Sequence, residues 1–479
     1  MSARRFVRRG SLRAGLVLGL VAAAHLVASP QTPPQNAPST PTAPAGAQNV
    51  AVTSSNGTLP DGMVWRITMP TSGWNGTLLL DLDFANGGNG YIPLYNRGYA
   101  AAGITRIAFE QGGRDSRVSA AQLMQVLDIF TKAHGKPPYV IVNGGSTGGV
   151  VSGYTLEHYP ARVDGAVANC TVPGYIPFLT YKLDYLFAAQ VLLGLDPKAF
   201  PIVEIPANFS AIAAEWRTRI TAAQATPEGR ARIALAVGIG QAQTWAVTSL
   251  ATPPDVNNLD QVQAYMFATL REGYGADASP RRSQEQQVGG KAYNWNTGVD
   301  YSRMFRLMRP EHLAAVQKFY KDAGLDLQAD VAKVNNAPRI AADRAAVEEI
   351  NLHGDYSGKP EKPFLINNLT GDSSVSPQAS GAYVELVKKN GKGDLVRLIH
   401  VNGAGHCGFR ANERVAAIEV MNERVRTGAW PSTAAAALNA RASAIDSSIV
   451  PRFIDFVLPE TGRAWFGTGD HYSPAPPIR

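Results

Sequence analysis

A serine flanked by glycines, placed between a strand and a helix, is the sequence feature that most restricts how this chain can fold. Gly144-Gly145-Ser146-Thr147-Gly148 matches the pattern Gly-x-Ser-x-Gly. It follows Tyr139 to Val142, a β-branched run that predicts a strand, and precedes Val150 to His158, which predicts a helix. A sharp turn between the two strains its central residue and needs small residues on either side. The segment therefore predicts a raised, accessible hydroxyl on Ser146.

The hydroxyl of Ser146 is predicted to be a nucleophile. The N-terminus of the following helix lies beneath it and favours developing negative charge. The alternative is a glycine-rich loop that cradles a phosphate. No lysine follows these glycines, however, and their spacing is not that of such a loop.

His406 is the predicted base. A serine hydroxyl is a weak nucleophile at neutral pH and needs a base within hydrogen-bond reach. Of the eight histidines, His406 lies in the glycine-rich loop Gly403 to Gly408, directly after a predicted strand, Leu395 to Val401. An imidazole there can reach over the carboxyl edge of a parallel sheet. His353 is the second candidate, and the other histidines are expected to be ordinary surface or packing residues.

Asp372 is the predicted carboxylate partner of that base, which holds the imidazole tautomer and stabilises the imidazolium. It follows the predicted strand Pro363 to Leu369, so its loop should lie at the same edge of the sheet. The alternative is a turn or helix N-cap aspartate. The three residues occur in the chain order serine, aspartate, histidine, and each is predicted to lie at the same edge of the sheet.

Predicted strands and helices alternate in two stretches of the chain, with a different kind of segment between them. The alternation predicts an α/β fold, with a mostly parallel sheet and helices on both faces, over residues 49–171 and 359–479. Residues 172–358 are mostly helical by composition and rich in aromatic residues, so we expect a large inserted helical cap; an independent second domain is the alternative. The cap helices are expected at Asp184 to Leu193, Ser210 to Ala223, Gly229 to Ser249, Val262 to Glu272, Pro310 to Ala323 and Arg339 to Leu352.

The N-terminus predicts export. Residues 1–29 combine five arginines, a short apolar run and a small-residue cleavage site, as in a signal peptide; a retained anchor is the alternative. Residues 30–48 are rich in Pro, Thr, Ala and Gln and predict a disordered linker. We therefore expect a secreted or periplasmic protein, without stable membrane insertion after signal cleavage.

The net charge bears on which partners this protein can bind, and the cysteines bear on the compartment in which it folds. Removing the five signal arginines from the net charge of +7 leaves +2, and the basic residues are scattered, which argues against nucleic acid as a partner. The only two cysteines are Cys170 and Cys407. In an exported protein they indicate one long-range disulfide, with two buried thiols as the alternative.

The motifs resemble those of the α/β-hydrolase superfamily, and more narrowly those of a group of secreted bacterial serine hydrolases. Asn143 to Gly149 and His406-Cys407 are also similar to the tannase and feruloyl esterase family, which has a cysteine beside the nucleophile and another beside the histidine. Here Gly145 precedes the nucleophile instead. The resemblance therefore implies that a Cys170–Cys407 bridge would fix the histidine loop by a different route.

The resemblance also implies an oxyanion hole made of two backbone N–H groups. One is that of Thr147, directly after the nucleophile. The other belongs to the loop after the strand Thr77 to Leu82, where this chain has Asp83-Phe84-Ala85-Asn86-Gly87-Gly88 and many relatives have His-Gly-Gly. Phe84 is the expected donor, and Ala85 is the second candidate.

The predicted activity is hydrolysis of a carboxylic ester through an acyl-enzyme on Ser146. The substrate would be a small-molecule or polymer-derived ester, and this chemistry needs no metal and no organic cofactor. The alternatives are an aminopeptidase-type peptidase of the same fold, an acyltransferase and a non-catalytic binding protein. A peptidase would need an acidic cluster in the cap to bind a free amine, and Glu204, Glu215, Asp326 and Asp330 form no convincing one.

Overall fold

The computed structural model describes residues 50–463, apart from residues 88, 108–114, 246–251, 355 and 373. The predicted signal peptide, 1–29, and the predicted linker, 30–48, lie outside the described residues. Among the helices that are described, none has both the length and the apolar character needed to cross a membrane.

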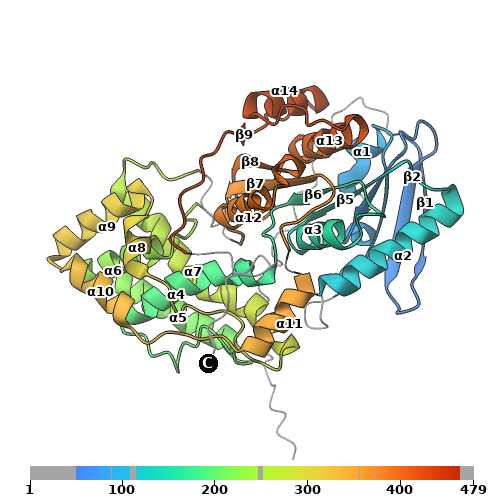
Figure 1. Ribbon diagram of the computed structural model, residues 1–479. Helices are drawn as coiled ribbons and strands as arrows, with labels where there is room; N and C mark the ends of the chain where they lie inside the picture. The colour runs from blue at the N-terminus through green and yellow to red at the C-terminus, as the bar shows by residue number, and fades with distance from the viewer. Residues whose placement is uncertain are drawn as a thin grey trace, which may run out of the picture. The chain divides into compact units, whose positions relative to one another are not determined.

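Within the described residues the strands form one nine-stranded sheet, in the order β1-β2-β4-β3-β5-β6-β7-β8-β9 (Figure 1). The neighbours from β4 to β8 pair in parallel, whereas β1, β2 and β9 join antiparallel at the two edges. The strands are β1 (Val52–Thr58), β2 (Val64–Pro70), β3 (Thr77–Asp81), β4 (Ala100–Ile104), β5 (Tyr139–Gly145), β6 (Gly165–Asn169), β7 (Phe364–Gly371), β8 (Val396–Ala404) and β9 (Phe453–Ile454).

The central strands are buried on both faces, because helices cover each side of the sheet. Leu78 and Leu80 of β3 pack into one hydrophobic core, and Leu79, which points to the opposite face, packs into another. The first core includes residues of α2, α3 and α12, and the second includes residues of α1, α13 and α14. These helices are α1 (Ile92–Tyr95), α2 (Ser116–His134), α3 (Thr147–His158), α12 (Pro377–Lys389), α13 (Ala411–Thr427) and α14 (Ala435–Ile445).

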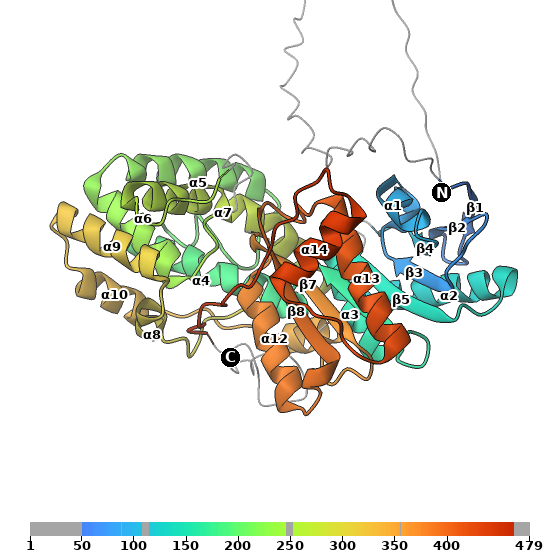
Figure 2. The same ribbon diagram turned by 90° about the horizontal axis from the view of Figure 1, so that it is seen from above.

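Helices alone fill the described chain between β6 and β7, and they form the inserted cap. They have their own hydrophobic core, which is centred on residues such as Trp216 and Ile233, and Figure 2 shows α5 to α10 gathered in one group beside the strands. The α/β fold with a large inserted helical cap is thus confirmed. The cap helices are α4 (Tyr175–Leu193), α5 (Phe209–Gln224), α6 (Pro227–Ile239), α7 (Leu259–Gln287), α8 (Tyr301–Arg306), α9 (Pro310–Ala323), α10 (Leu327–Asn336) and α11 (Arg344–Gly354).

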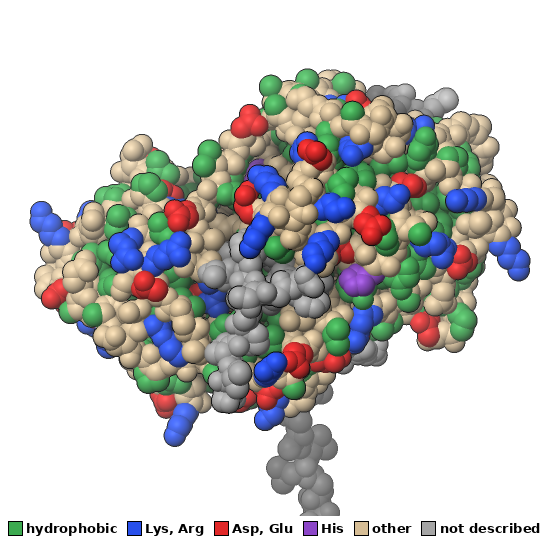
Figure 3. All heavy atoms as spheres, viewed as in Figure 1, with side chains coloured by type: hydrophobic (Ala, Val, Ile, Leu, Met, Phe, Trp, Pro, Cys, Tyr) green, Lys and Arg blue, Asp and Glu red, His purple; other side chains and the backbone are tan. Residues whose placement is uncertain are grey.

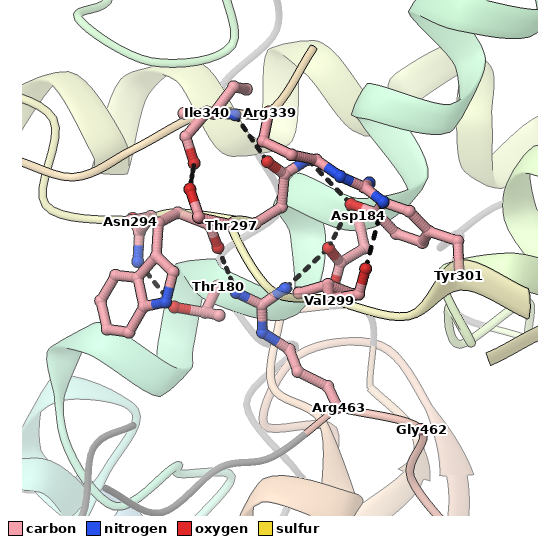
Figure 4. A network of polar contacts seen from close by, with 12 residues as sticks. Thr180, Asp184, Asn294, Thr297, Val299, Tyr301, Arg339, Ile340, Gly462 and Arg463 are labelled. Carbon is pink, nitrogen blue, oxygen red and sulfur yellow. Dashed lines mark hydrogen bonds and ion pairs between the residues drawn. The ribbon is translucent and has the colours of Figure 1, made fainter. Parts of the chain in front are cut away.

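A buried polar network ties the chain that follows β9 back to the cap (Figure 4). Asp184 of α4 accepts hydrogen bonds from Arg463 Nη1, at 2.7 Å to each carboxylate oxygen, and from the hydroxyl of Tyr301 at 2.8 Å. Arg463 Nη2 also donates to the carbonyl of Trp295. Burial raises the pKa of Asp184 and the charge of Arg463 opposes that rise. Removing either member of the pair would leave a buried charge uncompensated.

On the face of the molecule in Figure 3, basic and acidic side chains are interspersed among hydrophobic and other residues. Exposed side chains of opposite charge also pair with each other among the described residues, for example Arg219 with Glu215 and Arg344 with Glu348. Neither sign of charge is gathered over one element on this face.

Candidate active site

Ser146 occupies the sharp turn between β5 and α3. Its φ of 55° lies in the region that non-glycine residues rarely adopt, so its backbone is strained. A Cβ on Gly144 would lie 2.5 Å from the backbone of Gly148, which explains the need for glycine two residues before the serine. The turn is held by the N–H of Ser146, which donates to the carbonyl of Asn169 at 3.0 Å.

The structure brings Ser146, His406 and Asp372 together. Nε2 of His406 lies 2.8 Å from Oγ of Ser146, and Nδ1 of His406 lies 2.9 Å from Oδ2 of Asp372. With Nδ1–H donating to the carboxylate, Nε2 is left to accept the proton of the hydroxyl. The carboxylate of Asp372 is completely buried, whereas the imidazole is one-third exposed. The imidazole is therefore accessible from the surface, while the carboxylate that it contacts stays out of water.

The parallel sheet explains why these distant residues meet. Ser146, Asp372 and His406 follow β5, β7 and β8, and the carboxyl ends of parallel strands share one edge. Gly371 is paired in register with Ala404, so the two loops start side by side. Oδ1 of Asp372 also accepts the N–H of Ser374 at 2.8 Å, which orients the carboxylate toward the imidazole.

Cys170 and Cys407 form a disulfide, and their Cα atoms are 5.1 Å apart. Sγ of Cys407 lies 3.8 Å from Nε2 of His406. A Cβ on Gly145 would lie 3.5 Å from Sγ of Cys170 and 3.7 Å from Sγ of Cys407. The bridge thus packs against both Gly145 and His406, and a larger residue at 145 would crowd it.

The bridge also accounts for a cluster that has the composition of a metal site. One candidate ligand atom from each of Cys170, His406 and Cys407 lies within 4.8 Å of the others. Cysteine binds metals as a thiolate. The two sulfurs are bonded to each other and offer no thiolate. The disulfide therefore explains why these three residues lie close together.

We expect the bridge to keep His406 in place. In a Cys170→Ser/Cys407→Ser double variant, kcat should fall about tenfold or more, since small displacements of a catalytic group are costly. The free energy of unfolding should fall by about 2–5 kcal/mol. Ester hydrolysis and denaturant unfolding would measure the two effects.

Reductant provides the control for this variant. It should reproduce the loss of activity in the wild-type protein and change nothing further in the double variant. Wild-type protein that keeps its full kcat after complete reduction would contradict the role of the bridge.

The predicted oxyanion residues border the same turn. The N–H of Thr147 is the first of α3, and its side chain is buried. The loop after β3 passes beside that helix end, since a Cβ on Gly148 would lie 3.6 Å from Oδ2 of Asp83. Phe84 begins a short 3-10 helix, Phe84–Asn86, and packs its ring edge-on against Tyr91. The side chain of Phe84 is therefore buried in the core and is not available to a substrate.

Asp81, at the end of β3, fixes this loop. Its Oδ1 accepts the N–H of Asp83 at 2.9 Å, and its Oδ2 accepts the hydroxyl of Tyr91 and Nδ2 of Asn143, the latter at 3.4 Å. Desolvation and the charge of Asp83 raise the pKa of Asp81 to about 6. A single carboxylate thus links the loop after β3 to the strand that carries the serine.

The polar contacts continue across the sheet as a chain of buried amides. Nδ2 of Asn169 donates to Oδ1 of Asn143 at 3.2 Å, and Nδ2 of Asn367 donates to Oδ1 of Asn169 at 3.0 Å. All donors point toward Asp81, so the amide dipoles are aligned along the strand ends. Sequence reasoning missed this chain. An amide or carboxylate side chain near the end of four successive strands was the available signal.

A pocket with mostly apolar walls opens beside Ser146. α3, the segment after β6, α4 and the loop after β7 contribute its walls. The lining residues are Ser146, Thr147, Val150, Thr171, Val172, Tyr175, Phe178 and Val375.

The structure places the other candidate histidine in a different contact. His353, at the end of α11, shares a hydrogen bond of 3.0 Å with Glu349 one helical turn earlier. Burial lowers the pKa of His312 to about 3 and that of His400 to about 4, which keeps both neutral. These three histidines are thus packing residues.

The chain matches one family and one curated relative over most of its described length. The model of the tannase-like family of unknown function (DUF6351) matches residues 51–301. A protein named o-phthalyl amidase, from Xanthobacter agilis, is 35% identical over 453 residues, which are 88% of this chain and 99% of that protein.

Several solved structures are similar in fold alone. An esterase from Aspergillus oryzae has a TM-score of 0.37 at 12% identity and aligns with 80% of this chain and 87% of its own. Feruloyl esterase B from the same organism has a TM-score of 0.36 at 13% identity, with coverages of 79% and 81%. The chain covers only 36% of a Bacteroides ovatus protein described as a dipeptidyl aminopeptidase IV, at 9% identity and a TM-score of 0.36. By the family model and the relative, this chain belongs to the tannase-like family of unknown function, DUF6351, and has the α/β-hydrolase fold.

Proposed function

We propose that this hydrolase cleaves a carboxylic ester through an acyl-enzyme on Ser146. The observation that supports this proposal is the distance of 2.8 Å between Oγ of Ser146 and Nε2 of His406, whose Nδ1 lies 2.9 Å from the buried carboxylate of Asp372. A hydroxyl so placed can lose its proton to the imidazole as it attacks a carbonyl carbon.

The proposed reaction has two halves. Oγ of Ser146 bonds to the carbonyl carbon while its proton moves to Nε2 of His406, and the N–H groups of Thr147 and Phe84 stabilise the resulting oxyanion. The oxyanion collapses, and His406 protonates the departing alcohol. Water then attacks the acyl-enzyme, gives its proton to His406 and releases the acid as Ser146 regains its proton. Asp372 stays ionised and stabilises the imidazolium throughout.

An amide of an aromatic acid is the second candidate substrate. The relative named o-phthalyl amidase favours it, and the apolar pocket that includes Tyr175 and Phe178 offers space for an aromatic acyl group. The acyl-enzyme would be the same, with an amine as the leaving group. An aminopeptidase is less favoured, because two acidic cap residues that a free amine would need are paired elsewhere, Glu215 with Arg219 and Asp330 with Arg232.

A panel of esters and amides tests the proposal. We expect the purified protein to hydrolyse aryl esters, to react covalently with a fluorophosphonate probe at Ser146, and to prefer aromatic over long-chain acyl groups. Labelling of a different residue, or no turnover of any ester or amide in the panel, would contradict it.

Export is part of the proposal. The predicted signal peptide supports it, and the Cys170–Cys407 disulfide fits an oxidising compartment. Mass spectrometry of the protein from the culture medium or periplasm would locate the mature N-terminus.

We expect Asp81→Asn to lower kcat about tenfold while KM changes little, because it loosens the oxyanion loop rather than the pocket.

The pKa of Asp81 is raised to about 6 from 3.8, so the folded protein keeps a proton that the unfolded chain has released between these values. The free energy of unfolding therefore loses this contribution as pH rises from about 4 to 6. Urea unfolding at several pH values across this range should show a smaller decrease in the free energy of unfolding for Asp81→Asn than for the wild-type protein.

Asp61→Asn is the matched control. A hydrogen bond from Gln122 lowers the pKa of Asp61, so its contribution to stability has the opposite sign and is lost as the pH falls. An Asp81→Asn protein with wild-type kcat would show that this carboxylate does not position the loop.

A further inference from the structure

Three side chains beside Ser146 have the spacing of metal ligands. Sγ of Cys407 lies 3.8 Å from Nε2 of His406, and one ligand atom from each of Cys170, Cys407 and His406 lies within 4.8 Å of the other two. With Zn–S bonds of about 2.3 Å and Zn–N bonds of about 2.0–2.1 Å, a tetrahedral zinc ion holds such ligand atoms about 3.5–3.8 Å apart. Two thiolates at these positions would therefore need only small side-chain rotations to share an ion with the imidazole.

The imidazole of His406 is already oriented as in a metal ligand. Nδ1 contacts both carboxylate oxygens of Asp372, at 3.1 and 2.9 Å, so Nδ1 donates its proton and Nε2 is left with the lone pair. Histidines that bind zinc almost always donate their other ring N–H to a carboxylate, a carbonyl or water, which fixes the tautomer and raises the basicity of the ligand. Asp372 would thus support a metal ligand through the same contact by which it supports the base.

An ion can reach these atoms from solvent. His406 is exposed and Cys407 is half-buried, whereas Cys170 is buried. Oγ of Ser146 lies 2.8 Å from Nε2 of His406, so this hydroxyl or a water molecule would complete a four-coordinate site. Thiolate and imidazole ligands favour Zn²⁺ over Mg²⁺ or Ca²⁺. Among the residues that the structure describes, no other group of three Cys, His, Asp or Glu side chains brings its ligand atoms so close together.

From this geometry we propose that the reduced protein binds Zn²⁺ through Cys170, Cys407 and His406, and that the ion holds the hydrolase inactive. A dithiol reductant transfers two electrons and two protons to the disulfide, which becomes two thiols, while the dithiol closes to a cyclic disulfide. Zn²⁺ then replaces the two thiol protons, which are released to solvent. The oxidised protein has no thiolate to offer, so the site exists only in the reduced state.

Zinc would stop the proposed acyl-enzyme chemistry at its first step. The lone pair of Nε2 that is to accept the proton of Ser146 would be bound to the ion instead. The effect on activity therefore rests on the proposed function, whereas the metal site itself rests on the contacts of the three ligands.

A cobalt titration of the reduced protein tests the site directly. The protein is reduced with dithiothreitol, freed of the reductant and kept without oxygen, and Co²⁺ is added as a coloured substitute for Zn²⁺. We expect one Co²⁺ per chain, with a near-ultraviolet thiolate band and the visible bands of four-coordinate cobalt, and Zn²⁺ should displace it. The oxidised protein should show none of these bands. Equal bands in the oxidised protein, or no bands in the reduced protein, would overturn the inference.

Three variants identify the ligands. In the reduced state, Cys170→Ser and His406→Ala should each weaken Co²⁺ binding by more than about 100-fold, because loss of only the hydrogen-bond partner of a ligand already costs about 10- to 100-fold. Asp372→Asn removes such a partner and should fall in that lower range. The matched control is His134→Ala, since His134 lies at the exposed end of α2. Ligand variants that bind Co²⁺ as tightly as this control would contradict the assignment.

Activity and folding give two further readouts. Zn²⁺ should abolish the ester hydrolysis that the reduced protein retains, and EDTA should restore it, while the oxidised protein keeps its activity in Zn²⁺. If reduction unfolds the protein, as judged by circular dichroism, Zn²⁺ should refold it, because a site that exists only in the folded chain converts binding into folding free energy. A folded reduced protein that zinc does not inhibit, or an unfolded one that zinc does not refold, speaks against the proposal.

Failure of the underlying function is distinguishable from failure of this inference. If no ester is hydrolysed and a fluorophosphonate does not label Ser146 in the oxidised protein, the acyl-enzyme proposal is wrong, and the cobalt titration still decides the metal site. If the oxidised protein is active and the reduced protein gives no thiolate band with Co²⁺, only the metal site is wrong.

Discussion

Replacing Ser146 by alanine should lower kcat for ester hydrolysis by about 10³-fold or more. The variant lacks the atom that would form the acyl-enzyme, so any remaining turnover must come from water bound in the same site. KM should change little, because the pocket walls are intact. Steady-state kinetics on an aryl ester, together with loss of fluorophosphonate labelling, would measure the effect.

Ser152→Ala is the matched control for this substitution. Ser152 lies in α3, the helix that begins directly after Ser146, is completely buried and donates to the carbonyl of Gly148 at 2.8 Å. Its loss should change kcat by no more than about threefold, as for a typical internal hydrogen bond. A Ser146→Ala protein with activity within about tenfold of wild type would overturn the assignment of the nucleophile.

Asp372→Asn should lower kcat by about 10³- to 10⁴-fold with little change in shape. The carboxylate accepts Nδ1–H of His406, whereas an amide at the same place can donate to Nδ1. The imidazole would then carry its proton on Nε2, where it could no longer accept the proton of Ser146. Fluorophosphonate labelling should slow in parallel with turnover, since it needs the same base.

The fold of the Asp372→Asn protein should survive, since the amide oxygen can still accept the N–H of Ser374. Asp326→Asn is the control, because Asp326 caps α10 through the N–H of Ala329 and asparagine caps equally well. We expect its kcat to match wild type. An Asp372→Asn enzyme as active as this control would show that the aspartate does not orient the base.

Local patterns predicted the serine turn and its partners because each depends on short stretches of chain. The turn at Ser146 needs glycines at fixed positions, and the loops of Asp372 and His406 each follow a recognisable strand. Parallel strands then bring the three loops to one edge. The Cys170–Cys407 bridge was also predictable, because there are only two cysteines to pair.

Other elements were predicted incorrectly or not at all. The helix expected at 229–249 ends at Ile239, and Gln241 has a φ of 49°, which a helix cannot contain. The helix expected at 262–272 extends to Gln287 and includes Pro280. β1 was not predicted, since its exposed residues have no apolar alternation and it pairs only with β2.

Helix α4 illustrates why periodicity fails in a buried element. It begins at Tyr175, although the pattern predicted a start at Asp184. Almost all its residues are buried, so apolar side chains surround the axis and no single face stands out. That missed first half contains Tyr175 and Phe178, which line the pocket beside Ser146.

The sequence by itself determined the α/β fold with its inserted cap and which residues could form a nucleophile, a base and a carboxylate, because these depend on local chain geometry and chain order. Only the tertiary structure decided which side chains meet across the strands. The Asp81 carboxylate with its chain of asparagines, and the rings of Tyr175 and Phe178 beside Ser146, are placements that sequence reasoning had not found. They are set by the register of neighbouring strands and by the rotation of a helix about its axis, and neither leaves a periodic pattern along the chain.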